Sequence, residues 1–203
     1  MPEVTWIHPW LSEILKLIPI NVKSLIDIGC GRGIIGAIVR IYRELNRLVG
    51  IDIFKPYLDF CHKINVYDEL YELDLRKIPL PFDEKEFDVA ACIEVIEHVP
   101  KENGLKLLKE LERIAKIVIV SAPNVFFYQK AYDNNPFQKH VSEWRVKDFT
   151  KQGYKVLGVG NFIVFGRYNP YLSTLLSKFS YMMPTFSDTL LAYKTTKELN
   201  VIK

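Results

Sequence analysis

Short apolar, β-branched runs alternate with segments of helical periodicity from residue 23 to about residue 120. The runs have the length of buried strands, and the segments between them have the length of single helices. Such alternation predicts βαβ units with right-handed crossovers, and therefore a parallel sheet in a doubly wound α/β domain. The expected strands are 23–29, 48–54, 70–75, 87–93 and 117–123, and the expected helices are 34–46, 55–65 and 101–115.

Beyond residue 121 the rhythm changes. Residues 121–144 are irregular and rich in aromatic side chains, which is typical of a functional loop rather than a bare connector. A short helix is expected over 145–153, a strand over 154–166 and a last strand over 188–195. The hydrophobic segment 169–183 favours a packed helix or hairpin over a membrane-surface helix.

The chain length favours one domain over 1–203. We divide it into an N-terminal cap helix within 1–22, a ligand-binding core over 23–125, and a region over 126–203. That last region is expected to hold the substrate-side loop, a cap segment and the last strands.

Composition narrows the class of protein. The net charge of +3 comes from 27 basic and 24 acidic residues mixed along the chain, so no basic stripe supports nucleic-acid binding. Three cysteines, Cys30, Cys61 and Cys92, lack the spacing of a disulfide framework or a zinc site, and no metal site is expected. A reducing cytoplasm fits best. The N-terminal residues do not read as a signal peptide. No apolar run reaches about 18 residues, the length that indicates a membrane span.

Residues 24–36 read SLIDIGCGRGIIG, with four glycines following an apolar strand. Glycine allows a sharp turn and lets backbone amides approach a ligand. Gly31, Gly33 and Gly36 match the dinucleotide fingerprint, and Asp52 follows Gly33 by 19 residues, near the expected ribose ligand. One interpretation is therefore an NAD(P)-dependent oxidoreductase. Asp27 argues against it, because a carboxylate before the turn would repel a pyrophosphate.

The run Asp27-Ile28-Gly29-Cys30-Gly31-Arg32-Gly33 resembles the first motif of class I S-adenosylmethionine-dependent methyltransferases of the small-molecule type, an acidic residue followed by G-x-G-x-G. S-adenosylmethionine carries an ammonium and a sulfonium group and no phosphate, so an acidic residue suits it. The resemblance covers about residues 23–125. It implies a Rossmann-like sheet of seven strands, mostly parallel with the last strand antiparallel, and helices on both faces.

The resemblance also implies cofactor contacts in order along the chain. Asp52 would hold the ribose hydroxyls and Asp74 the adenine amino group, although Asp74 also reads as an ordinary turn residue. The segment Glu94–Val99, which follows the fourth strand, would begin beside the cofactor. Gly36 is instead expected to pack the helix on the sheet, and Glu97 could simply start or brace the next helix. The implied cofactor-binding residues are Asp27, Gly29, Cys30, Gly31, Gly33, Asp52, Ile53, Asp74, Leu75, Ile93 and Glu94.

Methyl transfer from a sulfonium is an in-line displacement, so the protein mainly aligns the reacting atoms. His140 and His98 are the candidate catalytic residues, since an oxygen nucleophile of high pKa benefits from a general base. A histidine that only ties the loop to the sheet is the open alternative for His140. Methyltransferases that act on the exocyclic amines of nucleic-acid bases often have a characteristic turn after the fourth strand. This chain lacks that turn, which disfavours methylation of a base.

The expected function is methyl transfer to an oxygen or nitrogen atom of a small, partly apolar acceptor. Besides the oxidoreductase, a non-catalytic, cofactor-binding subunit of the same fold remains open. The sequence indicates neither the acceptor nor the oligomeric state. Aromatic side chains would line the acceptor pocket or only close the core: Trp6, Trp10, Phe126, Phe127, Tyr128, Tyr132 and Phe137.

Overall fold

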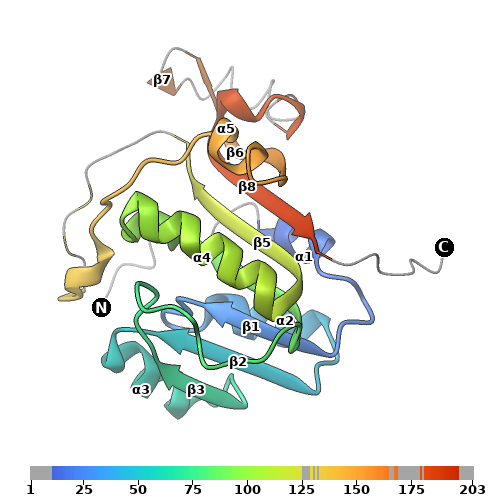
Figure 1. Ribbon diagram of the computed structural model, residues 1–203, viewed down its shortest axis with the longest axis vertical. Coiled ribbons are helices and arrows are strands. Elements are labelled where there is room, and N and C mark those ends of the chain that lie inside the picture. The colour runs from blue at the N-terminus through green and yellow to red at the C-terminus, as the bar shows by residue number, and fades with distance from the viewer. Residues whose placement is uncertain are drawn as a thin grey trace.

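The computed structural model of the protein describes residues 11–124, 129, 131, 133–164, 167–168, 179 and 181–196. Strands and helices alternate along most of this chain (Figure 1). The α-helices are α1 (Leu11–Leu17), α2 (Ile34–Tyr42), α3 (Lys55–Ile64), α4 (Lys101–Ile114) and α5 (Val146–Thr150), and the 3-10 turns are η1 (Ile96–His98), η2 (Pro136–Gln138) and η3 (Pro184–Phe186). The strands are β1 (Ser24–Ile28), β2 (Arg47–Asp52), β3 (Glu69–Glu72), β4 (Phe87–Ile93), β5 (Ala115–Pro123), β6 (Lys155–Val164), β7 (Arg167–Tyr168) and β8 (Ser187–Thr195).

The strands form one sheet in the order β3-β2-β1-β4-β5-β8-β6-β7. β1 to β5 are parallel to one another, and β8 runs antiparallel between β5 and β6. The two-residue β7 only extends the edge beyond β6. The remaining strands confirm the predicted doubly wound sheet of seven strands with the last strand antiparallel.

Two apolar cores hold helices on opposite faces of the sheet (Figure 1). One core joins the sheet to α4 and α5 through buried residues such as Leu107 and Phe149. The other joins it to α1, α2 and α3, through residues such as Ile14 and Val39. Burial on both faces explains why the central strands read as continuous apolar runs.

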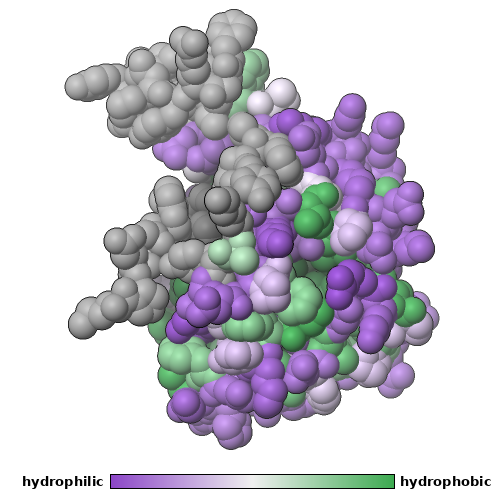
Figure 2. Space-filling model, turned by 90° about the vertical axis from the view of Figure 1, so that its left-hand side faces the viewer, coloured by the Kyte–Doolittle hydropathy of each residue, from purple (hydrophilic) through white to green (hydrophobic). Residues whose placement is uncertain are grey.

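Register brings the ends of three strands to one edge. Asp27 of β1 lies opposite Gly50 of β2 and Ala91 of β4, so the residues after these strands emerge side by side. In open parallel sheets ligands bind at this carboxyl edge, where the direction of chain progression changes. The edge lies on the left of Figure 1 and faces the viewer in Figure 2.

Element boundaries differ from the expectations in a few places. α2 ends at Tyr42 rather than at residue 46, because Arg43 is extended and its guanidinium donates to the carbonyls of Leu15 and Ile18. The N-terminal helix starts at Leu11 within the described chain. Six of the seven aromatics proposed for the acceptor pocket, all but Phe137, and most of segment 169–183 lie outside the described residues. Across the described residues no helix is long and apolar enough to cross a membrane.

Candidate active site

The glycine loop after β1 turns in backbone conformations that favour glycine. Gly29, Gly31 and Gly33 have φ values of 68°, 52° and 82°. A Cβ atom on Gly29 would lie 2.6 Å from a methyl group of Val95, which follows β4. The loop therefore passes directly against the end of the neighbouring strand, a path that a side chain at Gly29 would block.

Asp52 fixes this loop from the end of β2. Its Oδ2 accepts a hydrogen bond from the Gly31 amide at 2.9 Å, and its Oδ1 accepts one from the Phe54 amide at 2.8 Å. Burial raises the pKa of Asp52, while these amides partly oppose the shift. The carboxylate at the position predicted for ribose binding thus also orders the backbone of the predicted cofactor loop.

A cleft opens at this edge, and its empty volume, partly continuous with solvent, is about 650 Å³. Figure 2 looks onto this side of the molecule, where apolar residues gather in the lower middle among hydrophilic ones. Seven of the predicted cofactor residues line the cleft together with His98: Gly29, Gly31, Asp52, Ile53, Asp74, Leu75 and Glu94. The residues that sequence reasoning did not assign to it are Arg76, Val95, Val99, Asn135, Phe137 and Gln138.

Asp27 does not line the cleft but lies beneath the loop. It is buried, and its Oδ2 accepts a hydrogen bond from the Tyr67 hydroxyl at 2.6 Å. Burial raises the pKa of Asp27 to about 7, against the lowering effect of the Tyr67 hydrogen bond. Its predicted attraction for the cofactor ammonium would therefore act from behind the loop.

Three further predicted cofactor residues, Cys30, Gly33 and Ile93, also lie outside the lining of the cleft. The neighbouring Cys61 thiol donates to the Gly31 carbonyl at 3.3 Å, and a Cβ on Gly33 would lie 3.2 Å from its sulfur. Cys30, Cys61 and Cys92 are all buried, with free thiols. These residues support the loop from the side of the core.

Asp74 stands at the rim with a close partner. Arg76 donates to both Asp74 oxygens at 2.8 Å, and this pairing lowers the pKa of Asp74. The Arg76 guanidinium in turn lies 5.9 Å from the ring centre of Phe137. The adenine contact of Asp74 stays a prediction.

Glu94 follows β4 with a φ of 54°, a left-handed backbone that non-glycine residues adopt rarely. The Ser121 hydroxyl donates to its Oε1 at 2.7 Å, and burial raises the pKa of Glu94 to about 7. A strained carboxyl residue facing a cleft is a feature of functional sites.

His98 and His140, the two candidate catalytic residues, meet in the structure. Their ring centres are 5.0 Å apart, and one potential ligand atom each from Glu97, His98 and His140 lie within 4.8 Å of one another. His98 Nδ1 donates to the Lys139 carbonyl at 3.0 Å. Glu97 Oε2 is buried and has no hydrogen-bond partner among the described residues.

Burial sets the protonation of this cluster. It lowers the pKa of His98 to about 4, so its imidazole is neutral at pH 7. Burial and then the nearby charge of Glu94 raise the pKa of Glu97 well above its usual range. The buried Glu97 carboxyl group beside two imidazoles could hold a divalent cation, although the sequence alone predicted no metal site.

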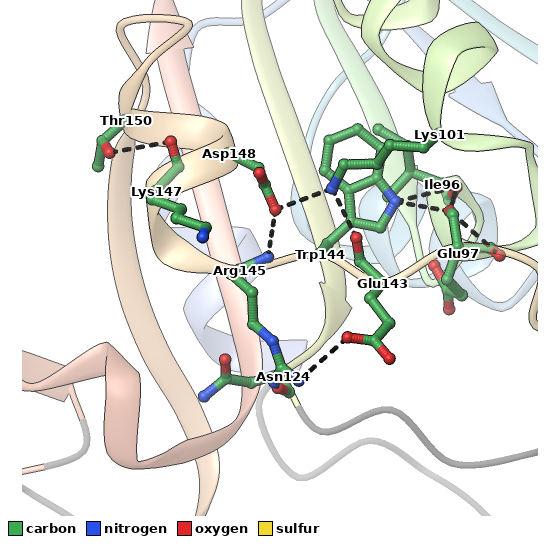
Figure 3. A network of polar contacts seen from close by, with 11 residues as sticks. Ile96, Glu97, Lys101, Asn124, Glu143, Trp144, Arg145, Lys147, Asp148 and Thr150 are labelled. Carbon is green, nitrogen blue, oxygen red and sulfur yellow. Dashed lines mark hydrogen bonds and ion pairs between the residues drawn. The ribbon is translucent and has the colours of Figure 1, made fainter.

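A polar network behind the cluster fixes the turn that carries it (Figure 3). Trp144 Nε1 donates to the Ile96 carbonyl at 3.3 Å, and the Lys101 ammonium lies 3.6 Å from the centre of the Trp144 ring. Lys101 also pairs with Asp148 at 2.8 Å. The segment after His140 is therefore tied to both η1 and α4.

Part of the chain is similar to known methyltransferases. Residues 26–117 match a family model described as a methyltransferase domain. An uncharacterized protein of Methanocaldococcus jannaschii is 31% identical over 158 residues, 72% of this chain and 62% of that protein. A ubiquinone biosynthesis O-methyltransferase of Glaesserella parasuis is 29% identical over 133 residues, 51% of this chain and 52% of that enzyme. The chain thus spans 52–62% of the length of these curated relatives.

A solved structure of an S-adenosylmethionine-dependent methyltransferase from Archaeoglobus fulgidus has the same fold. Its TM-score is 0.58 at 14% identity, and the match covers 91% of this chain and 92% of that one. The fold is that of the class I S-adenosylmethionine-dependent methyltransferases, and residues 26–117 are similar to a methyltransferase domain. This similarity favours S-adenosylmethionine as the candidate cofactor.

Proposed function

We propose that this protein methylates an oxygen atom of a small, partly apolar acceptor, and that a divalent cation at Glu97, His98 and His140 holds that acceptor. The single observation that carries the proposal is the buried, unpartnered Glu97 Oε2 beside two imidazoles at the rim of the cofactor cleft. The 29% identity to a ubiquinone biosynthesis O-methyltransferase over 133 residues supports an oxygen acceptor.

Electrostatics favours a cation at this cluster. A buried carboxylate without a partner loses its hydration and gains nothing in return, so such groups are usually paired or bind metal ions. The charge of Glu94 adds to that of Glu97. A divalent cation would compensate both carboxyl groups and would keep them ionised at pH 7.

The hydrogen bonding of His98 also fits a ligand. Because its Nδ1 donates to the Lys139 carbonyl, the neutral ring presents the lone pair of Nε2. Ligating histidines commonly donate their other ring nitrogen to a carbonyl or carboxylate, which fixes the tautomer. Imidazole and carboxylate together suit ions such as Mn²⁺, Fe²⁺, Co²⁺ or Zn²⁺.

A divalent cation would supply Lewis acidity, which lowers the pKa of a hydroxyl group in contact with it. The residues of the chain orient the partners: the glycine loop and Asp52 hold the cofactor, and the cluster holds the acceptor at the rim. In the transfer a C–O bond forms as the C–S bond breaks, and sulfur keeps the electron pair of that bond. The acceptor proton passes to solvent, and S-adenosylhomocysteine remains.

One other function and one other mechanism have less support. In a dinucleotide-binding oxidoreductase Gly36 would complete the fingerprint, but here it lies in α2 and faces the ring of Tyr67. A metal-free mechanism, with His98 or His140 as general base, uses the same residues and predicts no response to chelation. The experiment below separates this alternative from the proposal.

The test combines cation binding with methyl transfer. The paramagnetic resonance signal of free Mn²⁺ should decrease when the unchanged protein is added. It should stay at its initial level when Glu97→Gln or His140→Ala is added instead. The matched control His62→Ala changes an exposed histidine on α3 and should bind Mn²⁺ as the unchanged protein does.

Methyl-labelled cofactor is then incubated with fractionated cell extract, after treatment with EDTA and again after Mn²⁺ is restored. We expect the label to appear in a small hydroxyl-bearing acceptor. The amount of label transferred should fall at least tenfold after EDTA and should recover when Mn²⁺ is restored. Unchanged transfer after EDTA, or Mn²⁺ binding that survives Glu97→Gln, would overturn the role of the cation. Labelled amines would overturn the oxygen acceptor.

A further inference from the structure

Residues 133–140, which we name the strap, contact both the cofactor cleft and the cation cluster. We propose that the strap couples the two sites, so that the bound cation increases affinity for the cofactor and the cofactor increases affinity for the cation. This inference rests on the proposed function, because it needs a cation at Glu97, His98 and His140.

The first half of the strap belongs to the cofactor side. Asp133 pairs with the side chain of Arg32, a residue of the glycine loop. The same guanidinium lies 5.4 Å from the ring centre of Tyr57 on α3. Asn135 and Phe137 line the cleft with Gly29, Gly31 and Asp52. This half therefore closes one wall of the space where the cofactor binds.

The second half belongs to the cation cluster. The Lys139 carbonyl accepts the hydrogen bond that fixes the His98 ring, and His140 contributes a candidate ligand. Directly beyond the strap, the amides of Val141 and Ser142 donate to the Glu97 carbonyl at 2.9 and 3.1 Å. This end is anchored to the turn that carries the other two ligands.

The two ends differ in how firmly they are held. The Arg32–Asp133 pair is partly exposed, with 40% and 25% of the side chains accessible, and such pairs contribute about 0–1 kcal/mol. Asp133 and Asn134 also both have a φ of 56°, which is unfavourable for non-glycine residues. The contact of Asp133 with Arg32 can therefore release easily, whereas the other end stays attached to Glu97.

Coupling follows from this arrangement. A cation that draws His140 toward Glu97 and His98 restricts the strap, and the cofactor then loses less conformational freedom when it orders the same residues. By thermodynamic linkage the effect is reciprocal, and each ligand must change the affinity of the other by the same factor. Couplings of this kind are typically about 5- to 150-fold.

The experiment closes a thermodynamic cycle on the whole chain. Calorimetry gives the dissociation constant of S-adenosylhomocysteine with and without saturating Mn²⁺, and the Mn²⁺ resonance signal gives the affinity for Mn²⁺ with and without S-adenosylhomocysteine. We expect both affinities to rise by the same factor, at least fivefold. Asp133→Ala frees the cofactor end of the strap. In this variant each ligand should change the affinity for the other by less than twofold.

The control Asp59→Ala removes a more exposed ion pair with Lys55, on α3 and away from the strap, and should keep full coupling. Mn²⁺ binding without any change in cofactor affinity would overturn the coupling and would leave the proposed function intact. Full coupling in Asp133→Ala would overturn the role of the strap. No Mn²⁺ binding at all would overturn both the cation site and the coupling.

Discussion

Tyr67 shows at the scale of one residue how the glycine loop is supported. Its hydroxyl binds Asp27, and its ring lies so close to α2 that a Cβ atom on Gly36 would meet it at 2.5 Å. The helical pattern predicted Gly36 as a packing position rather than a ligand contact. The partner could not be predicted, because Tyr67 comes from the turn between α3 and β3, where no periodicity marks contacts.

We expect Asp27 to make stability depend on pH. The folded pKa, about 7, lies above the ordinary value, so the folded protein keeps a proton that the unfolded chain releases. Stability contributed by this group is therefore lost as the pH rises between about 4 and 7. Relative to Asp27→Asn, the free energy of unfolding should fall by up to about 4 kcal/mol across this window.

Urea unfolding from pH 4 to pH 8 measures this difference. The groups that face Asp27 are the Tyr67 hydroxyl, the Gly36 amide and, at longer range, Asp52, whose negative charge raises the pKa of Asp27 further. Tyr67→Phe serves as the control, because the loss of its hydrogen bond should extend the window upward. Parallel pH profiles for the unchanged protein and Asp27→Asn would contradict the expectation.

At the scale of elements, α4 packs closely against the segment that follows the strap. Gly104 in α4 faces Trp144, and a Cβ atom there would lie 2.5 Å from the indole ring. Hydrogen bonds to Ile96 and Ser142 hold that ring in place (Figure 3 shows the first). The close approach of α4 keeps η1, and with it Glu97 and His98, at the rim of the cleft.

Gly104→Ala should therefore destabilise the protein, although alanine favours a helix interior over glycine by about 1 kcal/mol. Overpacking against the fixed indole outweighs that gain, and we expect a net loss of about 1–3 kcal/mol in denaturant unfolding. The same change in a Trp144→Phe background, where the six-membered indole ring is absent, should be neutral or stabilising. Equal losses in both backgrounds would show that the contact is not responsible.

Elements defined by local periodicity were predicted well, and those defined by tertiary contacts were not. The strand over 87–93 coincides with β4, because a buried apolar run has clear limits. α5 is shorter than the predicted helix over 145–153 and ends at Thr150. The turn η2 within the irregular loop went unpredicted, since the Asn135 side chain that caps it has no distinctive sequence signal.

For the whole molecule, the order of strands decides which distant residues meet. Seven of the residues that the family resemblance implied line the cleft, because motif residues that follow parallel strands emerge at one edge. The sequence named His98 and His140 separately but did not predict their contact with Glu97. That contact depends on how the chain returns from β5 to η1, a path that neither propensity nor spacing specifies.

Cofactor binding should stabilise the whole domain, because its contacts exist only in the folded state. At 100 times its dissociation constant, S-adenosylhomocysteine should raise the free energy of unfolding by about 2.7 kcal/mol. Asp52→Ala removes the carboxylate at the predicted ribose site and the bond to Gly31. We expect at least a 30-fold loss of affinity, so that the same concentration of ligand stabilises this variant by less than about 1 kcal/mol.

Thermal or urea unfolding with and without ligand measures this gain within each variant, so the intrinsic loss of stability in Asp52→Ala cancels. Asp59→Ala, which changes an exposed carboxylate on the adjoining helix, should keep the full gain. NADH should stabilise neither protein. Gly36, the third glycine of the dinucleotide fingerprint, packs against Tyr67 and is not available to contact a dinucleotide. Stabilisation by NADH, or an undiminished gain in Asp52→Ala, would show that the ligand is held in a different way from the one that the cleft indicates.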